Sequence, residues 1–166
     1  MIEFKFHICA SVGMKTSLLF AALGVVTAFI LMLTIFGVNG IYDILIDEGL
    51  QIQLGVIAGI AALFLSATFL GRIAGRIICH KLHGFTGAVF VGVCLAISCI
   101  VIAVVAGALF GFLVQELSNI TPDHKSDFLV FILVPLFWIL FFGILPAMLL
   151  GGLYGILLRR RLAKVL

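Results

Sequence analysis

The chain has 166 residues, of which 64% are hydrophobic and only 10% charged, and its mean hydropathy is +1.41. Soluble domains carry about 25% charged residues, and a chain this short could not hide so much apolar surface from water. The composition therefore excludes a soluble protein and predicts an all-α integral membrane protein with a single membrane domain. The small formal net charge of +3 gives no indication of nucleic-acid binding.

The first apolar run covers residues 17–37 and follows Lys5 and Lys15. It exceeds the ~7–15 apolar residues of a secretory signal, so we expect a retained first transmembrane helix. Before it, residues 2–8 alternate strictly between apolar and polar side chains. This period of two indicates a strand. We expect the segment to lie in the membrane interface, with addition to the sheet edge of a partner as the alternative.

Three further apolar runs follow, each long enough to cross the ~30 Å hydrocarbon core as a helix. They predict helices over residues 51–79, 85–115 and 128–158. The last run contains Pro135 and Pro146, and each proline removes a backbone donor from the helix. We expect a kink that shapes the bundle. The alternative is a broken helix that lines a transport site.

The charged connections between these runs alternate in sign. Residues 39–50 and 116–127 are acidic apart from one lysine, whereas residues 72–84 and the tail 159–166 carry the basic residues. Basic connections stay on the cytoplasmic side of a membrane. The sequence therefore predicts a four-transmembrane-helix bundle with both termini cytoplasmic, and a bacterial cytoplasmic (inner) membrane as its location.

A weak internal repeat accompanies this pattern. The segments Leu70–Gly75 and Leu150–Gly155 lie eighty residues apart, and each falls at the cytoplasmic end of a predicted helix. Asp43 and Asp47 match Asp123 and Asp127 at the same offset. These matches indicate two duplicated helical hairpins, although short glycine and leucine patterns also recur by chance in membrane helices.

Small residues at four-residue spacing mark the predicted packing faces. In lipid, close van der Waals contact holds helices together, and small residues permit that contact. The first helix offers only Gly24 and Ala28. The faces serve either internal packing of one bundle or contact with another chain. The predicted packing residues are Gly55, Gly59, Gly107, Gly111, Gly151 and Gly155.

The basic residues of the second connection and the tail form a candidate binding surface. If the stretch after Gly71 is helical, its cations line one face at headgroup level. We predict that this surface binds an anionic lipid headgroup or an acidic partner, and ordinary anchoring by long basic side chains is the alternative. The residues concerned are Arg72, Arg76, His80, Lys81, His83, Arg159, Arg160 and Arg161.

The predicted spans contain no ionisable side chain, which argues against coupled ion transport by a single chain. We predict no catalytic residue and no cofactor. We also predict no metal site, because Cys79, His80 and His83 provide fewer than the four ligands of a structural zinc site. The four cysteines are interpreted as small packing residues, with at least Cys9 and Cys79 reduced on the cytoplasmic side.

These features favour a non-enzymatic membrane protein, an accessory or assembly subunit that forms a homo-oligomer or joins a larger membrane complex. A small oligomeric transporter or channel is the first alternative. A membrane-embedded hydrolase is the second, with Glu116 and the aspartates of the outer connections as its catalytic groups.

Overall fold

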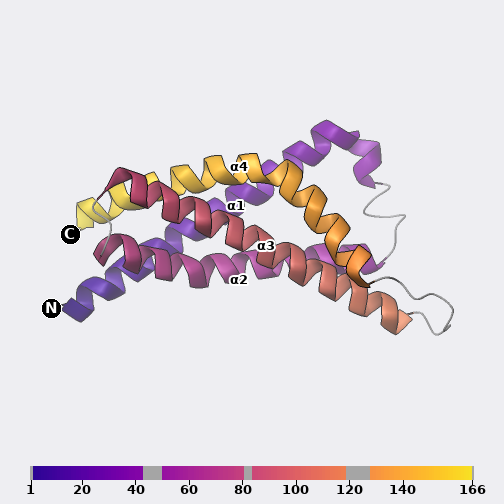
Figure 1. Ribbon diagram of the computed structural model, residues 1–166, viewed down its shortest axis with the longest axis horizontal. Helices are drawn as coiled ribbons and strands as arrows, with labels where there is room; N and C mark the ends of the chain where they lie inside the picture. Colours follow the sequence, from indigo (N-terminus) through magenta and orange to yellow (C-terminus); the bar gives the residue numbers. More distant parts are fainter. Residues whose placement is uncertain (1, 43–49, 81–83, 119–127, 166) are drawn as a thin grey trace.

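The computed structural model describes residues 2–42, 50–80, 84–118 and 128–165. These residues form four helices, and both ends of the chain lie at the same end of the molecule (Figure 1). Each helix contains a stretch long and apolar enough to cross a membrane, so the all-helical membrane architecture predicted from the composition is confirmed. The helices are α1 (Ile2–Tyr42), α2 (Leu50–His80), α3 (Phe85–Ser118) and α4 (Phe128–Val165).

The helix α1 begins at Ile2, well before the predicted start at residue 17. The strand signal in residues 2–8 is therefore wrong, because this segment is the first part of α1. A lone strand beside a membrane leaves its backbone groups unpaired, whereas a helix pairs them within the segment. At the other end Gly37 has a φ of 68° and kinks α1, a conformation that glycine adopts at little cost.

The basic segments extend the membrane helices. Residues 72–80 belong to α2, and α4 continues through the three arginines to Val165. The helix α4 is also continuous past Pro135 and Pro146, so it is not a broken helix. Figure 1 shows it bending between its two halves instead, as expected where a proline ring displaces the preceding turn.

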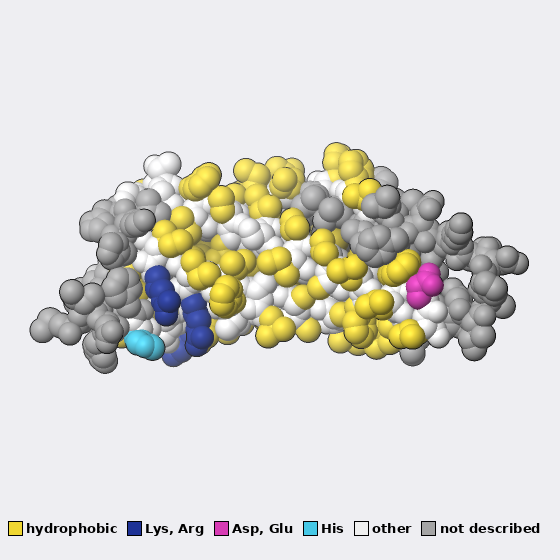
Figure 2. Space-filling view, turned by 60° about the horizontal axis from the view of Figure 1, so that its bottom comes forward, with side chains coloured by type: hydrophobic (Ala, Val, Ile, Leu, Met, Phe, Trp, Pro, Cys, Tyr) yellow, Lys and Arg dark blue, Asp and Glu magenta, His cyan; other side chains and the backbone are white. Residues whose placement is uncertain are grey.

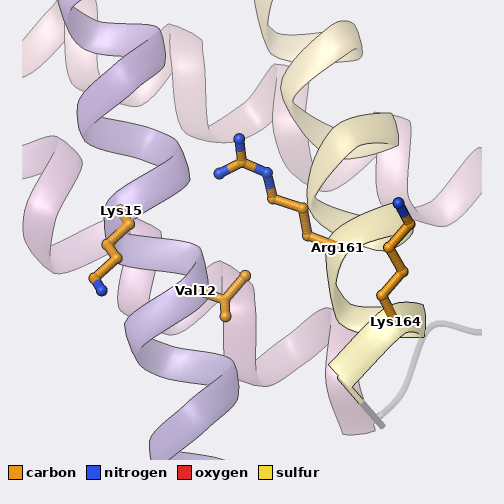
Figure 3. A pocket seen from close by; sticks show the side chains of 4 residues that line it. All are labelled: Val12, Lys15, Arg161 and Lys164. Atoms are coloured by element: carbon orange, nitrogen blue, oxygen red, sulfur yellow. The ribbon is translucent and has the colours of Figure 1, made fainter.

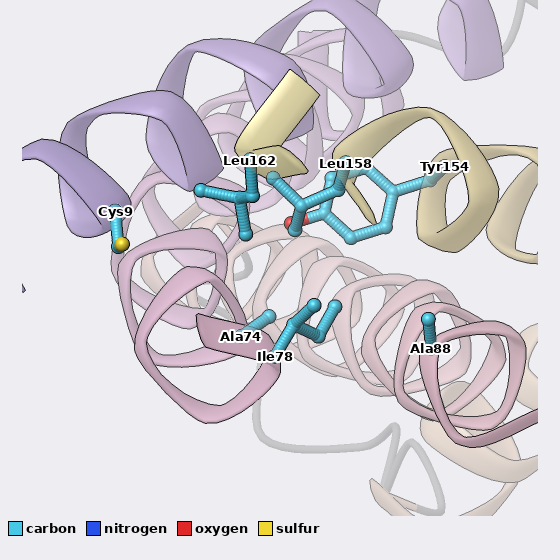
Figure 4. Close-up of a cluster of buried hydrophobic side chains, with 7 residues drawn as sticks. All are labelled: Cys9, Ala74, Ile78, Ala88, Tyr154, Leu158 and Leu162. Carbon is cyan, nitrogen blue, oxygen red and sulfur yellow. The ribbon is translucent and has the colours of Figure 1, made fainter. Parts of the chain in front are cut away.

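The four helices form a ring in which each packs against its neighbours. Contacts join α1 to α2, α2 to α3, α3 to α4 and α4 to α1, while α2 and α4 lie across the diagonal and barely touch. We call the end of the ring where α1 begins and where α2 and α4 finish the basic end. It contains the best-buried cluster in the described residues (Figure 4), which consists of Cys9, Ala74, Ile78, Ala88, Tyr154, Leu158 and Leu162.

The helices α1 and α2 cross through glycines near the basic end. A Cβ atom on Gly13 would overlap the carbonyl oxygen of Gly71, and one on Gly75 would overlap the carbonyl oxygen of Cys9. Ser17 reinforces the crossing, because its hydroxyl donates a 2.6 Å hydrogen bond to the carbonyl of Ala67. The backbones therefore touch directly, and a larger side chain at either glycine would separate the helices.

The helices α3 and α4 cross in the same manner. A Cβ atom on Gly92 would overlap the carbonyl oxygen of Gly151, and one on Gly155 would overlap that of Ala88. Two of the predicted packing residues, Gly151 and Gly155, thus lie inside the bundle. They face α3, whose backbone covers them.

The two crossings use corresponding positions of the chain. Gly71 and Gly75 lie eighty residues before Gly151 and Gly155, which occupy the same places in the second hairpin. Their contact partners also correspond at an offset of seventy-nine residues, Cys9 and Gly13 in α1 with Ala88 and Gly92 in α3. The two hairpins are thus packed through the same kind of contact between a glycine and the backbone of the neighbouring helix.

The remaining predicted glycines hold α2 against α3 in the half of the bundle away from the basic end. A Cβ atom on Gly55 would lie 3.0 Å from the carbonyl oxygen of Gly107, and one on Gly59 would lie 3.1 Å from that of Ala103. Gly111 packs beside Gly55, because its Cα would lie 3.5 Å from a Cβ atom on Gly55. All six predicted packing glycines are therefore engaged within the chain.

Candidate functional site

The described lysine and arginine side chains lie at the basic end (Figure 2). Arg72 and Arg76 are exposed on the outer side of α2, while the adjacent Gly71 and Gly75 face α1. In the last turns of α4, Arg160 and Arg161 are exposed and Arg159 is half-buried. His80 ends α2, but its side chain lies outside the described residues, as do Lys81 and His83.

Arg161 is anchored to another helix. Its Nη1 donates a 3.3 Å hydrogen bond to Oγ1 of Thr16 in α1. Thr16 is fully buried, and its hydroxyl donates a 2.8 Å hydrogen bond to the carbonyl of Val12. The hydroxyl proton thus points to Val12, which leaves an oxygen lone pair to accept from the guanidinium.

A pocket of about 260 Å³ lies beside this contact, between α1 and α4 (Figure 3). It is lined by Val12 and Lys15 of α1 and by Arg161 and Lys164 of α4. Arg161 belongs to the basic surface predicted from the sequence, whereas Lys15 and Lys164 were not part of that prediction. The positions of Lys15 and Lys164 in the sequence could have indicated this contact. The first helix begins and the last helix finishes at the basic end, so their cationic side chains can meet there.

The cysteine prediction is wrong for one pair, because Cys9 and Cys79 form a disulfide. The glycine crossing of α1 and α2 brings their Cα atoms to 6.3 Å, within the range that a disulfide spans. The other two cysteines, Cys94 and Cys99, are free thiols. A bonded Cys9 and Cys79 offer no thiolate to a metal ion.

Of the acidic residues predicted for the outer connections, Glu116 is the one whose side chain the structure describes. Glu116 is exposed near the end of α3. The aspartates that would have completed a hydrolase site, Asp43, Asp47, Asp123 and Asp127, lie outside the described residues. Within the described ranges, no three side chains of histidine, cysteine, aspartate or glutamate come together as a metal site.

The hydroxyl groups of the predicted spans, which an oligomeric transporter could use to line its path, bond to the backbone. Thr27 and Thr34 donate to carbonyls one turn earlier in α1, and Thr68 does the same in α2. Ser66 donates to the carbonyl of Leu63. These groups satisfy their own helices, so they supply no row of polar atoms along the bundle.

The half of α1 beyond Ala21 separates from the other helices (Figure 1). Five consecutive residues, 28–32, are exposed there. Successive residues of a helix lie about 100° apart, so five in a row cover every face. A Cβ atom on Gly24 would meet nothing within 4 Å. The pair Gly24 and Ala28 is thus a small-residue face that the described residues do not cover.

Comparison of the chain with protein-family models, with curated proteins and with solved structures finds no match.

Proposed function

We propose that this chain is a non-enzymatic subunit of a membrane complex, which binds a transmembrane helix of a larger partner through Gly24 and Ala28 of α1. The observation that carries this proposal is the open space around Gly24. The other small-residue faces are used inside the bundle, where each brings two helix backbones together. The same kind of face on α1 remains available.

The shape of α1 supports the same function. Its first half is fixed to α2 by the glycine crossing and to α4 through Phe20, whose ring lies 5.7 Å from that of Tyr154. Its second half extends into the membrane alone. A helix anchored at one end and apolar on all sides suits insertion between the helices of another protein.

The orientation belongs to this proposal as well. We place both termini and the basic end on the cytoplasmic side of a bacterial inner membrane, because cationic segments remain there. We also infer that the hairpins α1–α2 and α3–α4 arose by duplication, as in transporters with parallel repeats. The corresponding glycine contacts of the two crossings support this origin.

Photo-crosslinking in native membranes tests the docking face. A photoreactive amino acid at position 28 should give one discrete adduct with a larger membrane protein. The matched control is position 22, another exposed alanine of α1. It lies about 160° around the helix from Gly24 and should give no such adduct.

A substitution separates docking from mere proximity. Gly24→Leu should weaken binding of the partner in mild detergent by roughly five- to 100-fold, as expected from overpacking of about 1–3 kcal/mol. Ala22→Leu should leave copurification unchanged. An adduct of twice the chain mass would instead establish self-association, and no adduct at position 28 would contradict the docking face.

A further inference from the structure

We propose that Lys15, Arg161 and Lys164 bind the phosphate of an anionic lipid headgroup in the pocket between α1 and α4. This site is separate from the α1 docking face and involves the opposite half of that helix. The shared chemistry is a phosphate group. The structure favours a lipid as its source, and the experiment below distinguishes a lipid from free phosphate.

Three cations from two helices line one small pocket. Its volume of about 260 Å³ is several times the ~30 Å³ that a water molecule takes in the liquid, which leaves room for a phosphate group. Figure 3 shows Arg161 extending from α4 toward α1, above Val12. The aliphatic stems of the cations and Val12 give the pocket an apolar lining. Figure 3 shows the Arg161 guanidinium between the two helices and the ammonium groups of Lys15 and Lys164 on either side of it, from where these flexible side chains can swing over a bound headgroup.

Arg161 is held in place before any ligand arrives. Its hydrogen bond to the buried Thr16 joins α4 to α1 and restricts the guanidinium. This contact uses one of the five N–H donors of an arginine side chain. An arginine with a fixed plane can present two parallel donors to a phosphate, which a lysine cannot.

The three positive charges have no carboxylate beside them among the described side chains. Glu116, the acid whose side chain is described, lies near the end of α3 that is remote from the basic end. The acidic colour in Figure 2 accordingly appears at the opposite end from the lysines and arginines. Like charges in one pocket repel each other, and a bound anion removes that repulsion.

The apolar neighbours of the cations point to a lipid. Lys15, Leu19 and Leu23 follow at four-residue spacing on α1, as do Arg161, Leu157 and Leu153 on α4. Residues at this spacing share a helix face, and all four leucines are exposed. Both rows therefore run from a cation at the basic end toward the middle of the membrane. Acyl chains can follow these leucines, whereas a soluble phosphate would make no use of them.

Basic pockets between transmembrane helices are known sites for headgroups with more than one phosphate. The probe lipid we choose is therefore cardiolipin, which carries two. The experiment uses the full-length protein, purified in an uncharged detergent. Native mass spectrometry measures the bound lipid as cardiolipin, phosphatidylcholine or inorganic phosphate is titrated in.

Cardiolipin should be retained in preference to phosphatidylcholine. Arg161→Gln should lower its affinity by roughly tenfold more than Arg160→Gln does, as expected for a charge-assisted hydrogen bond. Arg160 is the matched control, because it is the exposed neighbour on the same helix and does not line the pocket. Both variants lose one positive charge, so general attraction to the lipid falls equally in both.

Lys15→Gln and Lys164→Gln provide the second test, since they leave the hydrogen bond between Arg161 and Thr16 intact. Each should weaken cardiolipin binding more than Arg160→Gln, in protein that melts at the wild-type temperature without lipid. Equal losses in all variants would overturn the pocket in favour of a diffuse basic surface. Displacement of cardiolipin by an equimolar concentration of inorganic phosphate would overturn the lipid as the source.

Discussion

Tyr154 is the largest side chain in the buried cluster of the basic end, and its ring and its hydroxyl lie in different environments. The ring packs edge-on against Phe20 at a centroid distance of 5.7 Å. The hydroxyl is buried and has no hydrogen-bond partner within the described part of the chain. A buried polar group without a partner loses its hydration and gains nothing in return. The ring therefore stabilises this site, and the hydroxyl opposes it.

Tyr154→Phe should leave the stability of the protein unchanged or raise it by about 1 kcal/mol, because it removes only the unpaired hydroxyl. Tyr154→Ala should destabilise it by about 3–5 kcal/mol, since the cavity of an aromatic ring remains. Thermal unfolding of the detergent-solubilised protein, followed by size-exclusion chromatography, measures both changes. A clear loss of stability in Tyr154→Phe would mean that the hydroxyl has a bonding partner.

The disulfide between Cys9 and Cys79 predicts a simple thiol count. In a Cys94→Ser/Cys99→Ser background, the denatured protein should show no reactive thiol before reduction and two after it. The reagent is a maleimide, added as freshly isolated membranes are denatured. Two thiols without reductant would restore the sequence-based interpretation of Cys9 and Cys79 as packing residues. Cytosolic thiols are normally kept reduced, so a bonded pair at a cytoplasmic basic end requires that the fully buried Cys9 keeps the bond out of reach of reductants.

At the scale of the helices, the strength of each crossing depends on which glycines face a backbone. Gly155 and Gly152 lie three residues apart in α4, yet only Gly155 would place a Cβ atom against a carbonyl oxygen. At Gly152 the Cβ would meet Cγ1 of Val89 at 3.7 Å, an ordinary contact. Both glycines have the same intrinsic helix propensity. They differ only in what they contact in the folded bundle.

Gly155→Ala should therefore destabilise the protein by about 1–3 kcal/mol, because the added methyl forces α3 and α4 apart. Gly152→Ala is the matched control and should be close to neutral. If the two hairpins are equivalent, Gly75→Ala should have the same effect as Gly155→Ala. Thermal unfolding in detergent measures all three. Equal effects of Gly152→Ala and Gly155→Ala would contradict the crossing geometry.

At the scale of the whole molecule, the two ends of the bundle differ in charge. The basic end holds both chain termini and the described lysines and arginines, and the other end holds Glu116 (Figures 1 and 2). A pattern of this kind orients a protein in the membrane, since cationic segments resist transfer across it. Lipid contacts at the basic end would reinforce the same orientation.

Reporter fusions should therefore place both termini on the same side of the membrane, and that side should be cytoplasmic. A reporter that fluoresces only in the cytoplasm should be active at either terminus, and a reporter enzyme active only outside should be inactive at both. A single insertion of the outside-active enzyme between residues 119 and 127 should give the reverse result. Termini on opposite sides would contradict the even number of spans.

Hydropathy and charge along the chain were enough to predict four membrane helices, because the length of an apolar run and the charges that bound it are local properties. They singled out six glycines but left out Gly13, Gly71 and Gly75, through which α1 and α2 cross. They did not predict which backbone each glycine meets or that Cys9 is bonded to Cys79. Nor did they predict that Gly24 is left open or that Lys15 joins Arg161. Those features depend on how helices from different parts of the chain pack against each other. That packing is set by side chains of two helices together, so it cannot be predicted from one span alone.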